Sequence, residues 1–251
     1  MSPVTDETSL RLFFDQIIAS QRKVPLKRVG GDSDGGYLLP DDLEGIELVI
    51  SPGVAQTATF EIEFAERGVP CIMIDASIAE LPRQHPRFIF YKKWLSTNDD
   101  AENVSLEKLM SVHQYSGDGV LQMDIEGNEY PILVAVNSDT LRKFRIIVIE
   151  FHHLDLLLNR QAFGLISACF GKLLKDFNIV HIHPNNCISP VHFREYSIPP
   201  VMEFTFHRKD RIGAGNKEPG LLIPNPDDVK NISHAPDVPL PQVWFASKRW
   251  G

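Results

Sequence analysis

The sequence predicts an α/β protein built on a mainly parallel sheet with helices on both faces. Short apolar runs alternate along the chain with segments in which apolar residues recur at helical spacing. Several of these runs stop at a carboxylate, as buried strands do where they reach the polar edge of a sheet. Strands that alternate with helices in this way form parallel sheets, and helices then bury both faces.

Each expected element has its own signal. An amphipathic helix is expected at residues 9–21, and the glycine- and aspartate-rich segment 29–40 predicts a hairpin tip. Apolar runs predict seven strands, at residues 47–52, 71–74, 87–91, 121–123, 146–149, 179–183 and 201–206. Helices are expected at residues 58–67, 105–113, 128–136 and 162–177, the second with Ser105 as its N-cap. No helix separates the last two strands, so the final strand is expected to be antiparallel and to run back between the fifth and sixth.

Composition limits the classes of function. A formal net charge of -8 argues against nucleic-acid binding, because sequence-independent binding requires a concentrated basic surface. The three cysteines are widely spaced and are expected to be reduced thiols of a cytoplasmic protein. The chain shows no signal-peptide pattern and no apolar run long enough to span a bilayer, so no membrane span is expected.

Three segments are expected: an N-terminal helix within residues 1–27, one α/β domain at residues 28–212, and a proline-rich arm at residues 213–251. Prolines spaced among Gly, Asn and Asp exclude a helix or an interior strand from the arm. The arm ends in Val-Trp-Phe at residues 243–245 and in Trp250, which is too apolar for a free tail. We expect it to dock on its own domain or, as the alternative, on a second copy in a homo-oligomer.

The strands before Asp124 and Glu150 direct attention to one edge of the sheet. If these strands are parallel neighbours, the two carboxylates lie at the same edge, roughly 5 Å apart across the strands. Open α/β sheets bind their ligands beyond the carboxyl ends of the strands. The candidate site is therefore expected at this edge, where Asp75 also ends a strand. Glu126 is expected to accept backbone amides of the turn and of the helix start that follows it, and the same role is the alternative to a site role for Asp124.

Four segments occur together and in a characteristic order. They are Asp-Gly-Gly-Tyr at residues 34–37, Met-Asp-Ile-Glu-Gly-x-Glu at 123–129, Ile-Glu-Phe-His at 149–152 and His-Ile-His-Pro-Asn-Asn at 181–186. With these segments the sequence resembles the FkbM-like family of S-adenosylmethionine-dependent methyltransferases, in broad outline from Arg28 to Arg208. The resemblance implies a Rossmann-like class I methyltransferase fold with a seven-stranded sheet and methyl transfer to an oxygen, often on a sugar.

The resemblance implies that S-adenosyl-L-methionine lies over the loop at residues 51–57. Its small residues Gly53, Ala55 and Thr57 would let the backbone approach the cofactor, although the loop keeps one glycine where the family usually has more. Asp75 would accept hydrogen bonds from the two ribose hydroxyls, and Asp124 is a further expected cofactor contact. The alternative for Asp75 is a helix cap or a surface turn.

Methyl transfer to a hydroxyl requires an aligned acceptor and removal of its proton. His152 or His183 is expected to be the base, because histidine titrates near neutral pH without help, and Asp124 is expected to take part in catalysis. A polar network that only closes the top of the sheet is the alternative for the histidines. Asp124 and Glu150 are also the expected ligands of Mg²⁺ or another divalent cation, which would lower the pKa of the hydroxyl.

The expected acceptor is a small molecule or a glycan. Asn185 and Asn186 are expected to donate to its hydroxyls, and Glu203 of the final strand should reach the same edge. The predicted function is therefore an S-adenosylmethionine-dependent O-methyltransferase acting on a sugar or a glycosylated small molecule, with or without metal assistance. Two alternatives stay open, a Rossmann-like binding or assembly module that has lost cofactor binding and a metal-dependent hydrolase.

Overall fold

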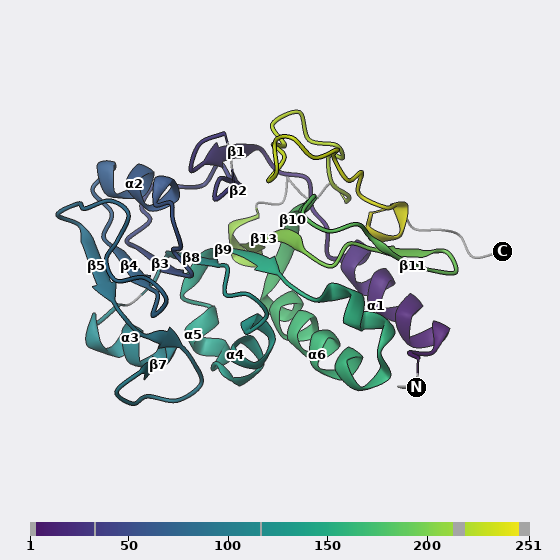
Figure 1. Ribbon diagram of the computed structural model, residues 1–251, viewed down its shortest axis with the longest axis horizontal. Coiled ribbons are helices and arrows are strands. Elements are labelled where there is room, and N and C mark those ends of the chain that lie inside the picture. The colour runs from purple at the N-terminus through teal and green to yellow at the C-terminus, as the bar shows by residue number, and fades with distance from the viewer. Residues whose placement is uncertain (1–3, 33, 116, 213–218, 246–251) are drawn as a thin grey trace.

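The computed structural model describes residues 4–32, 34–115, 117–212 and 219–245, and these residues are centred on a seven-stranded sheet. Its strands are β3 (Leu48–Pro52), β4 (Cys71–Ile74), β5 (Phe88–Tyr91), β8 (Gly119–Met123), β9 (Phe144–Phe151), β10 (Phe177–Pro184) and β13 (Met202–Arg208). The order is β10-β13-β9-β8-β3-β4-β5, and β13 is antiparallel to both of its neighbours. The predicted sheet is confirmed, because β13 runs back between β9 and β10 (Figure 1).

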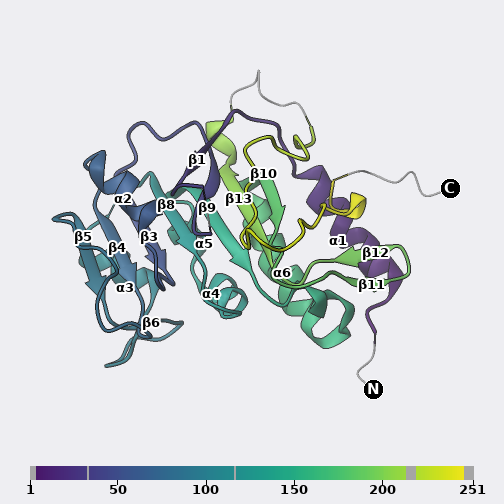
Figure 2. The same ribbon diagram turned by 45° about the horizontal axis from the view of Figure 1, so that its top comes forward.

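The two faces of the sheet are covered differently. Leu48 and Ile50 of β3 belong to one core, whereas Val49 between them belongs to another, as the alternation of side chains along a strand requires. The first face carries α1 (Glu7–Ala19), α3 (Leu106–Val112), α4 (Glu129–Ala135), α5 (Ser138–Leu141) and α6 (Arg160–Asp176). The second face carries α2 (Thr59–Glu66) and the antiparallel hairpin of β1 (Leu26–Val29) and β2 (Tyr37–Pro40). Helices on both faces are confirmed, with the hairpin covering part of the second face (Figure 2).

Polar side chains set the starts of the helices. Asp6 caps α1 by accepting a hydrogen bond from the Ser9 amide at 2.9 Å. Ser105 caps α3 as predicted, since its hydroxyl accepts from the Lys108 amide at 3.1 Å. Each cap satisfies an amide that the first helical turn leaves without a backbone partner.

Short elements complete the described chain. They are β6 (Trp94–Leu95), β7 (Asn103–Val104), β11 (Val191–Phe193), β12 (Tyr196–Ile198), and the 3₁₀ turns η1 (Leu154–Leu158), η2 (Lys209–Arg211) and η4 (Gln242–Trp244). Among the helices that the structure describes, none has the length and apolar character needed to cross a membrane.

The C-terminal arm packs on the same molecule through its apolar end. Trp244 is fully buried, and its ring meets Phe14 of α1 and Phe204 of β13 with centroids 4.9 and 5.9 Å apart. Its indole N–H donates to the carbonyl of Ser197 at 3.1 Å. Trp250 lies outside the described residues, and the division of the chain into three segments stays a prediction.

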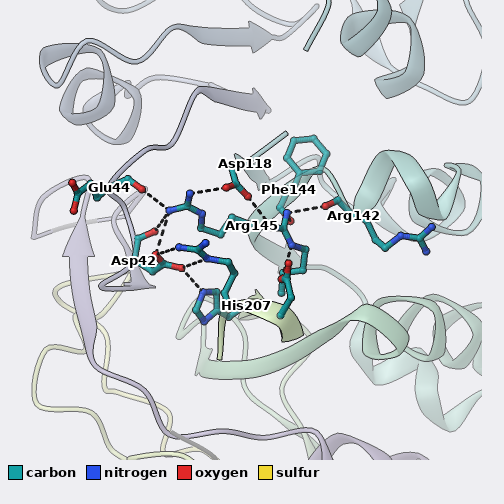
Figure 3. Close-up of polar contacts among 10 residues, drawn as sticks. Asp42, Glu44, Asp118, Arg142, Phe144, Arg145 and His207 are labelled. Carbon is teal, nitrogen blue, oxygen red and sulfur yellow. Dashed lines mark hydrogen bonds and ion pairs between the residues drawn. The ribbon is translucent and has the colours of Figure 1, made fainter. Parts of the chain in front are cut away.

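A polar network ties the opposite edge of the sheet together, at the amino ends of the parallel strands (Figure 3). The buried Arg145 of β9 donates to the carboxylates of Asp42 and Asp118, at 3.2 and 2.8 Å, and to the carbonyl of Glu44 at 2.6 Å. Arg208 of β13 donates to the same Asp118 at 2.8 Å. These contacts join β9 and β13 to the segments that follow β2 and precede β8.

Candidate active site at the carboxyl edge of the sheet

The candidate site lies where the strand order reverses. After β3 the chain adds β4 and β5 on one side and then returns to place β8 on the other, so β3 and β8 flank the switch point. Gly53 follows β3 with φ +87°, and a Cβ atom at this position would come within 1.5 Å of the Asp124 carbonyl oxygen. Glycine is therefore required here, because no side chain fits between the two strand ends.

Two cavities meet at this point. The larger, of about 590 Å³, is lined by residues that follow β4, β5 and β8, among them Asp75, Trp94, Asn103 and Glu126. The smaller, of about 320 Å³, lies toward the hairpin and α2 and is lined among others by Asp34, Tyr37, Thr57, Glu61 and Gln122. Gly53, Ala55 and Asp124 line both cavities, so the predicted cofactor loop separates them and Asp124 faces each.

Asp124, Glu150 and His152 form a compact cluster beside these cavities. β8 and β9 are parallel neighbours with Met123 opposite Ile149, which confirms the expected placement of the two carboxylates at one edge. One ligand atom from each of the three residues lies within 4.8 Å of the others. His152 Nε2 is 3.8 Å from Asp124 Oδ1 and 3.8 Å from Glu150 Oε1. The cluster can share a proton or hold a cation.

Glu129 fixes the orientation of His152. Its buried carboxylate oxygen Oε1 lies 3.1 Å from His152 Nδ1 and accepts the backbone amides of Ile125 and Gly127, at 3.3 and 3.1 Å. The expectation that Glu126 accepts these turn amides is wrong, since Glu129 accepts them while the Glu126 side chain is largely exposed. With Nδ1 facing Glu129, Nε2 faces Glu126 Oε2 at 3.4 Å and, at 3.8 Å each, Asp124 and Glu150.

Electrostatics favour shared protons in this cluster. Burial raises the pKa of Asp124 to about 7, an effect that the charge of His152 opposes. Burial, followed by the charges of Asp124 and Glu203, raises the pKa of Glu150 well above its ordinary value. Burial would lower the pKa of His152, but the hydrogen bond and charge of Glu129 outweigh burial and raise it. At neutral pH the cluster therefore contains groups that can both accept and release a proton.

Asp75 ends β4 as predicted and lines the larger cavity. Its carboxylate accepts the Ala55 amide at 3.0 Å on one oxygen, and the Ser77 amide and hydroxyl at 2.8 and 2.6 Å on the other. Burial opposes its ionisation, but these hydrogen bonds prevail and lower its pKa. Asp75 is thus an ionised group that joins the cofactor loop to the next strand, and its contact with a ribose stays a prediction.

A buried chain of hydrogen bonds joins residues that line the smaller cavity. Ser51 Oγ lies 2.6 Å from Gln122 Oε1 and also contacts Glu61, and Gln122 donates to the Tyr37 hydroxyl at 3.2 Å. One serine proton cannot serve two acceptors, and burial raises the pKa of Glu61, so a protonated Glu61 carboxyl satisfies the chain. The sequence pattern alone gave no role to Tyr37, Glu61 or Gln122.

The other predicted site residues lie on β10, the loop after it and β13. His181 and His183 both face Asp228 of the arm, which lies 2.8 Å from His181 Nε2 and 3.8 Å from His183 Nδ1. Asn185 donates to Glu150 at 2.9 Å and so touches the cluster. His183 thus has Asp228 as its ion-pair partner, whereas His152 is the histidine within the cluster.

Asn186 and Glu203 are held by the arm. Asn186 donates to the carbonyl of Ile232 at 2.9 Å and accepts its amide at 2.8 Å, so its amide group bonds to the protein backbone. Glu203 lies opposite Glu150 in the sheet register and accepts a hydrogen bond from Asn231 at 2.8 Å. The expected donation of Asn186 to a substrate stays a prediction.

Several residues of the site carried little signal in the sequence. Glu129 is part of the Asp-x-Glu-Gly-x-Glu segment, so its fixed spacing from Asp124 could have marked it. Trp94 follows the third strand of the predicted sheet, where an exposed aromatic residue could have been noted. Asp228 and Asn231 reach the site from the arm, and no local pattern identifies them.

The chain is similar to one family model and to several solved structures. The model of the methyltransferase FkbM domain matches residues 52–165. Of the solved structures, a fibrillarin/Nop5p complex has 15% identity and a TM-score of 0.41, covering 66% of this chain and 74% of its own. A putative hemolysin from Streptococcus thermophilus has 10% identity and a TM-score of 0.39, covering 82% and 68%. A single-site mutant of the 16S rRNA (adenine(1408)-N(1))-methyltransferase from Catenulisporales acidiphilia has 10% identity and a TM-score of 0.33, covering 73% and 97%.

No curated protein matches the sequence significantly. The matched segment, residues 52–165, contains the switch-point glycine, Asp75, Asp124, Glu150 and His152, whereas β10, β13 and the arm lie beyond it. The predicted resemblance is confirmed, because residues 52–165 match the model of the methyltransferase FkbM domain.

Proposed function

We propose that the protein transfers the methyl group of S-adenosylmethionine to a hydroxyl of a sugar or a glycosylated small molecule. The observation that carries this proposal is the position of Asp124. It lines both cavities at the switch point and belongs to the cluster with the buried Glu150 and His152. A cofactor that spans the two cavities would therefore present its central atoms to a proton-accepting cluster.

The cavities suit the two ends of the cofactor. Adenosine fits the larger one, where Trp94 offers an exposed ring for stacking and Asp75 an ionised carboxylate for the ribose. The methionyl end fits the smaller one, where its ammonium would meet Asp34 and Asp124. At Gly53 the loop backbone packs directly against the Asp124 carbonyl, so no side chain of the protein intrudes between the two cavities. The bound cofactor supplies an electrophilic methyl group.

The chain's own task is then to orient the acceptor and remove its proton. We assign the base to His152, because Glu129 holds Nδ1 while Nε2 faces the carboxylates of Glu126, Asp124 and Glu150 at the sheet edge. The acceptor hydroxyl would lie beside Glu150, whose carboxylate Asn185 holds at 2.9 Å. Its proton would pass to His152 Nε2 as the oxygen takes the methyl group, with the methyl–sulfur bond broken and S-adenosylhomocysteine left as the thioether product.

A divalent cation is the alternative occupant of the same cluster, in which His152 Nε2 would be a ligand and not the base. Asp124, Glu150 and His152 offer two oxygens and a nitrogen within 4.8 Å of one another. Asp124 Oδ1 is buried and has no hydrogen-bond partner among the described residues. Since buried oxygens normally have a partner, this atom is suited to bind a ligand. A cation held here would lower the pKa of the acceptor hydroxyl.

The charges favour a neutral acceptor. Beside Glu150, where the acceptor would lie, Asp124, Glu126 and Glu203 add further carboxylates. A phosphorylated or sulfated acceptor would be repelled by Asp124, Glu126 and their neighbours. A neutral polyol meets no such repulsion and finds carboxylate and amide acceptors for its hydroxyls.

A methyl-transfer assay tests the proposal. The protein would be incubated with S-adenosylmethionine and a panel of neutral methyl hexosides, with and without Mg²⁺, and release of S-adenosylhomocysteine measured. We expect release with at least one hexoside and little with hexose phosphates. Cofactor binding without transfer to any hydroxyl compound would contradict the sugar O-methyltransferase proposal.

A further inference from the structure

The middle of the C-terminal arm differs from its ends in the way it is held. At one end Pro219 pairs with Arg22, and at the other Trp244 is fully buried. Between them, residues 225–236 are held by polar side chains at the carboxyl edge of the sheet. We call residues 225–236 the strap; it runs beside the end of β10 and the start of β13 (Figures 1 and 2).

One set of polar contacts holds the strap against β10. Asp228 reaches His181 Nε2 at 2.8 Å and His183 Nδ1 at 3.8 Å, and its other bond is to the Asn225 amide at 3.0 Å. Asn186, two residues after β10, bonds to both the amide and the carbonyl of Ile232. These are hydrogen bonds and ion pairs that water can replace, unlike the apolar burial of Trp244.

Asn231 extends from the strap into the site itself. It donates to Glu203 at 2.8 Å and to Asp34 at 3.1 Å. Glu203 lies opposite Glu150 of the buried cluster, and Asp34 lines the smaller cavity. The Asn231 Oδ1 atom is buried and has no hydrogen-bond partner among the described residues. This oxygen can therefore accept a hydrogen bond beside Glu203 and Asp34.

We propose that the strap closes the acceptor side of the site and opens to admit the acceptor, and that Asn231 is the residue with which it binds the acceptor. This inference rests on the proposed function, since it takes a neutral polyol as the acceptor. The pairing of Pro219 with Arg22 and the buried Trp244 stay in place while the polar contacts of the strap separate. Opening therefore exposes no part of the hydrophobic core. Asn231 Oδ1 then accepts a hydroxyl of the bound polyol.

Trypsin cleavage after Lys230 measures opening, because cleavage follows the population of the open form. The products would be identified by mass spectrometry. We expect Asp228→Ala to raise the cleavage rate about tenfold, as loss of a charge-assisted hydrogen bond should. The control is His234→Ala, an exposed strap residue, which should leave the rate unchanged. An unchanged cleavage rate in Asp228→Ala would contradict the proposal that Asp228 holds the strap closed.

Protection by a polyol tests the link to the acceptor. Cleavage would be repeated with saturating S-adenosylhomocysteine and methyl hexosides at about 10 mM, above the usual KM range. We expect at least one hexoside to slow cleavage of the native protein severalfold, and Asn231→Ala to remove this protection. If S-adenosylhomocysteine binds and no hexoside protects, the strap proposal fails. If S-adenosylhomocysteine does not bind, the proposed function fails. The Asp228→Ala result then still decides whether the contacts of Asp228 hold the strap closed.

Discussion

At the scale of single residues, Gly53 is the most constrained position of the site. Its positive φ and the 1.5 Å approach of a Cβ atom to the Asp124 carbonyl leave no room for alanine. We expect Gly53→Ala to displace the cofactor loop and to weaken S-adenosylhomocysteine binding at least about tenfold, since a strained backbone position costs about 1–3 kcal/mol. Calorimetric titration measures this.

The matched control is Gly164→Ala in α6, where a Cβ atom meets nothing within 4 Å. Replacement of an open helical glycine should leave binding unchanged and add up to about 1 kcal/mol of stability. Equal affinities of Gly53→Ala and the native protein would show that no ligand approaches this loop.

Asp124 makes the second residue-scale prediction. Burial raises the pKa of this carboxyl to about 7, and asparagine keeps its shape while removing both the charge and the proton exchange. We expect Asp124→Asn to abolish methyl transfer while the circular dichroism spectrum and thermal midpoint stay within error of the native values. A variant that fails to fold would instead assign Asp124 a structural role.

At the scale of elements, ion pairs at the edge opposite the site join β9 and β13 to the neighbouring loops. Arg145 is buried between Asp42 and Asp118, and its loss would leave buried polar groups without partners. Removal of one partner from such a buried network costs about 3–5 kcal/mol, so Arg145→Ala should lower the free energy of unfolding by that amount in urea titrations. Arg11→Ala on the exposed side of α1 should change it by less than about 0.5 kcal/mol. Equal stability of the two variants would contradict this account.

The same network predicts a dependence on acid. The hydrogen bond from Arg145, opposed by burial and aided by Arg208, lowers the pKa of Asp118. A lowered pKa in the folded state contributes stability that is fully present above the unfolded pKa of about 3.9 and is lost as pH falls through the folded pKa. The stability difference between the native protein and Arg145→Ala should therefore shrink below about pH 4. A difference that stays constant from about pH 6 to about pH 3 would contradict the pairing.

At the scale of the whole molecule, the sequence predicted the sheet well. Apolar runs that end at a carboxylate, such as the one before Asp124, identify buried strands without any tertiary information. The missing helix between β10 and β13 predicted the antiparallel strand, and its position beside Glu150 followed. These features depend on local periodicity and on connection lengths, both of which a sequence displays.

The remainder of the site depends on contacts between distant segments. Asp228 meets His181 across 47 residues, and Asn231 meets Asp34 across 197 residues. The Pro-rich arm has no periodicity that would place it against the sheet. The sequence pattern includes Glu129 but does not reveal its role, because only the fold of the turn shows that the carboxylate of Glu129, and not that of Glu126, accepts the backbone amides.

The measurement that tests the central claim most directly is calorimetric titration of the purified protein with S-adenosylmethionine and S-adenosylhomocysteine, with Mg²⁺ and then with a chelator. We predict micromolar binding of both, weakened by about 1–3 kcal/mol in Asp75→Ala because ribose hydrogen bonds are lost. No binding under any of these conditions would contradict the account and favour a binding module that has lost the cofactor.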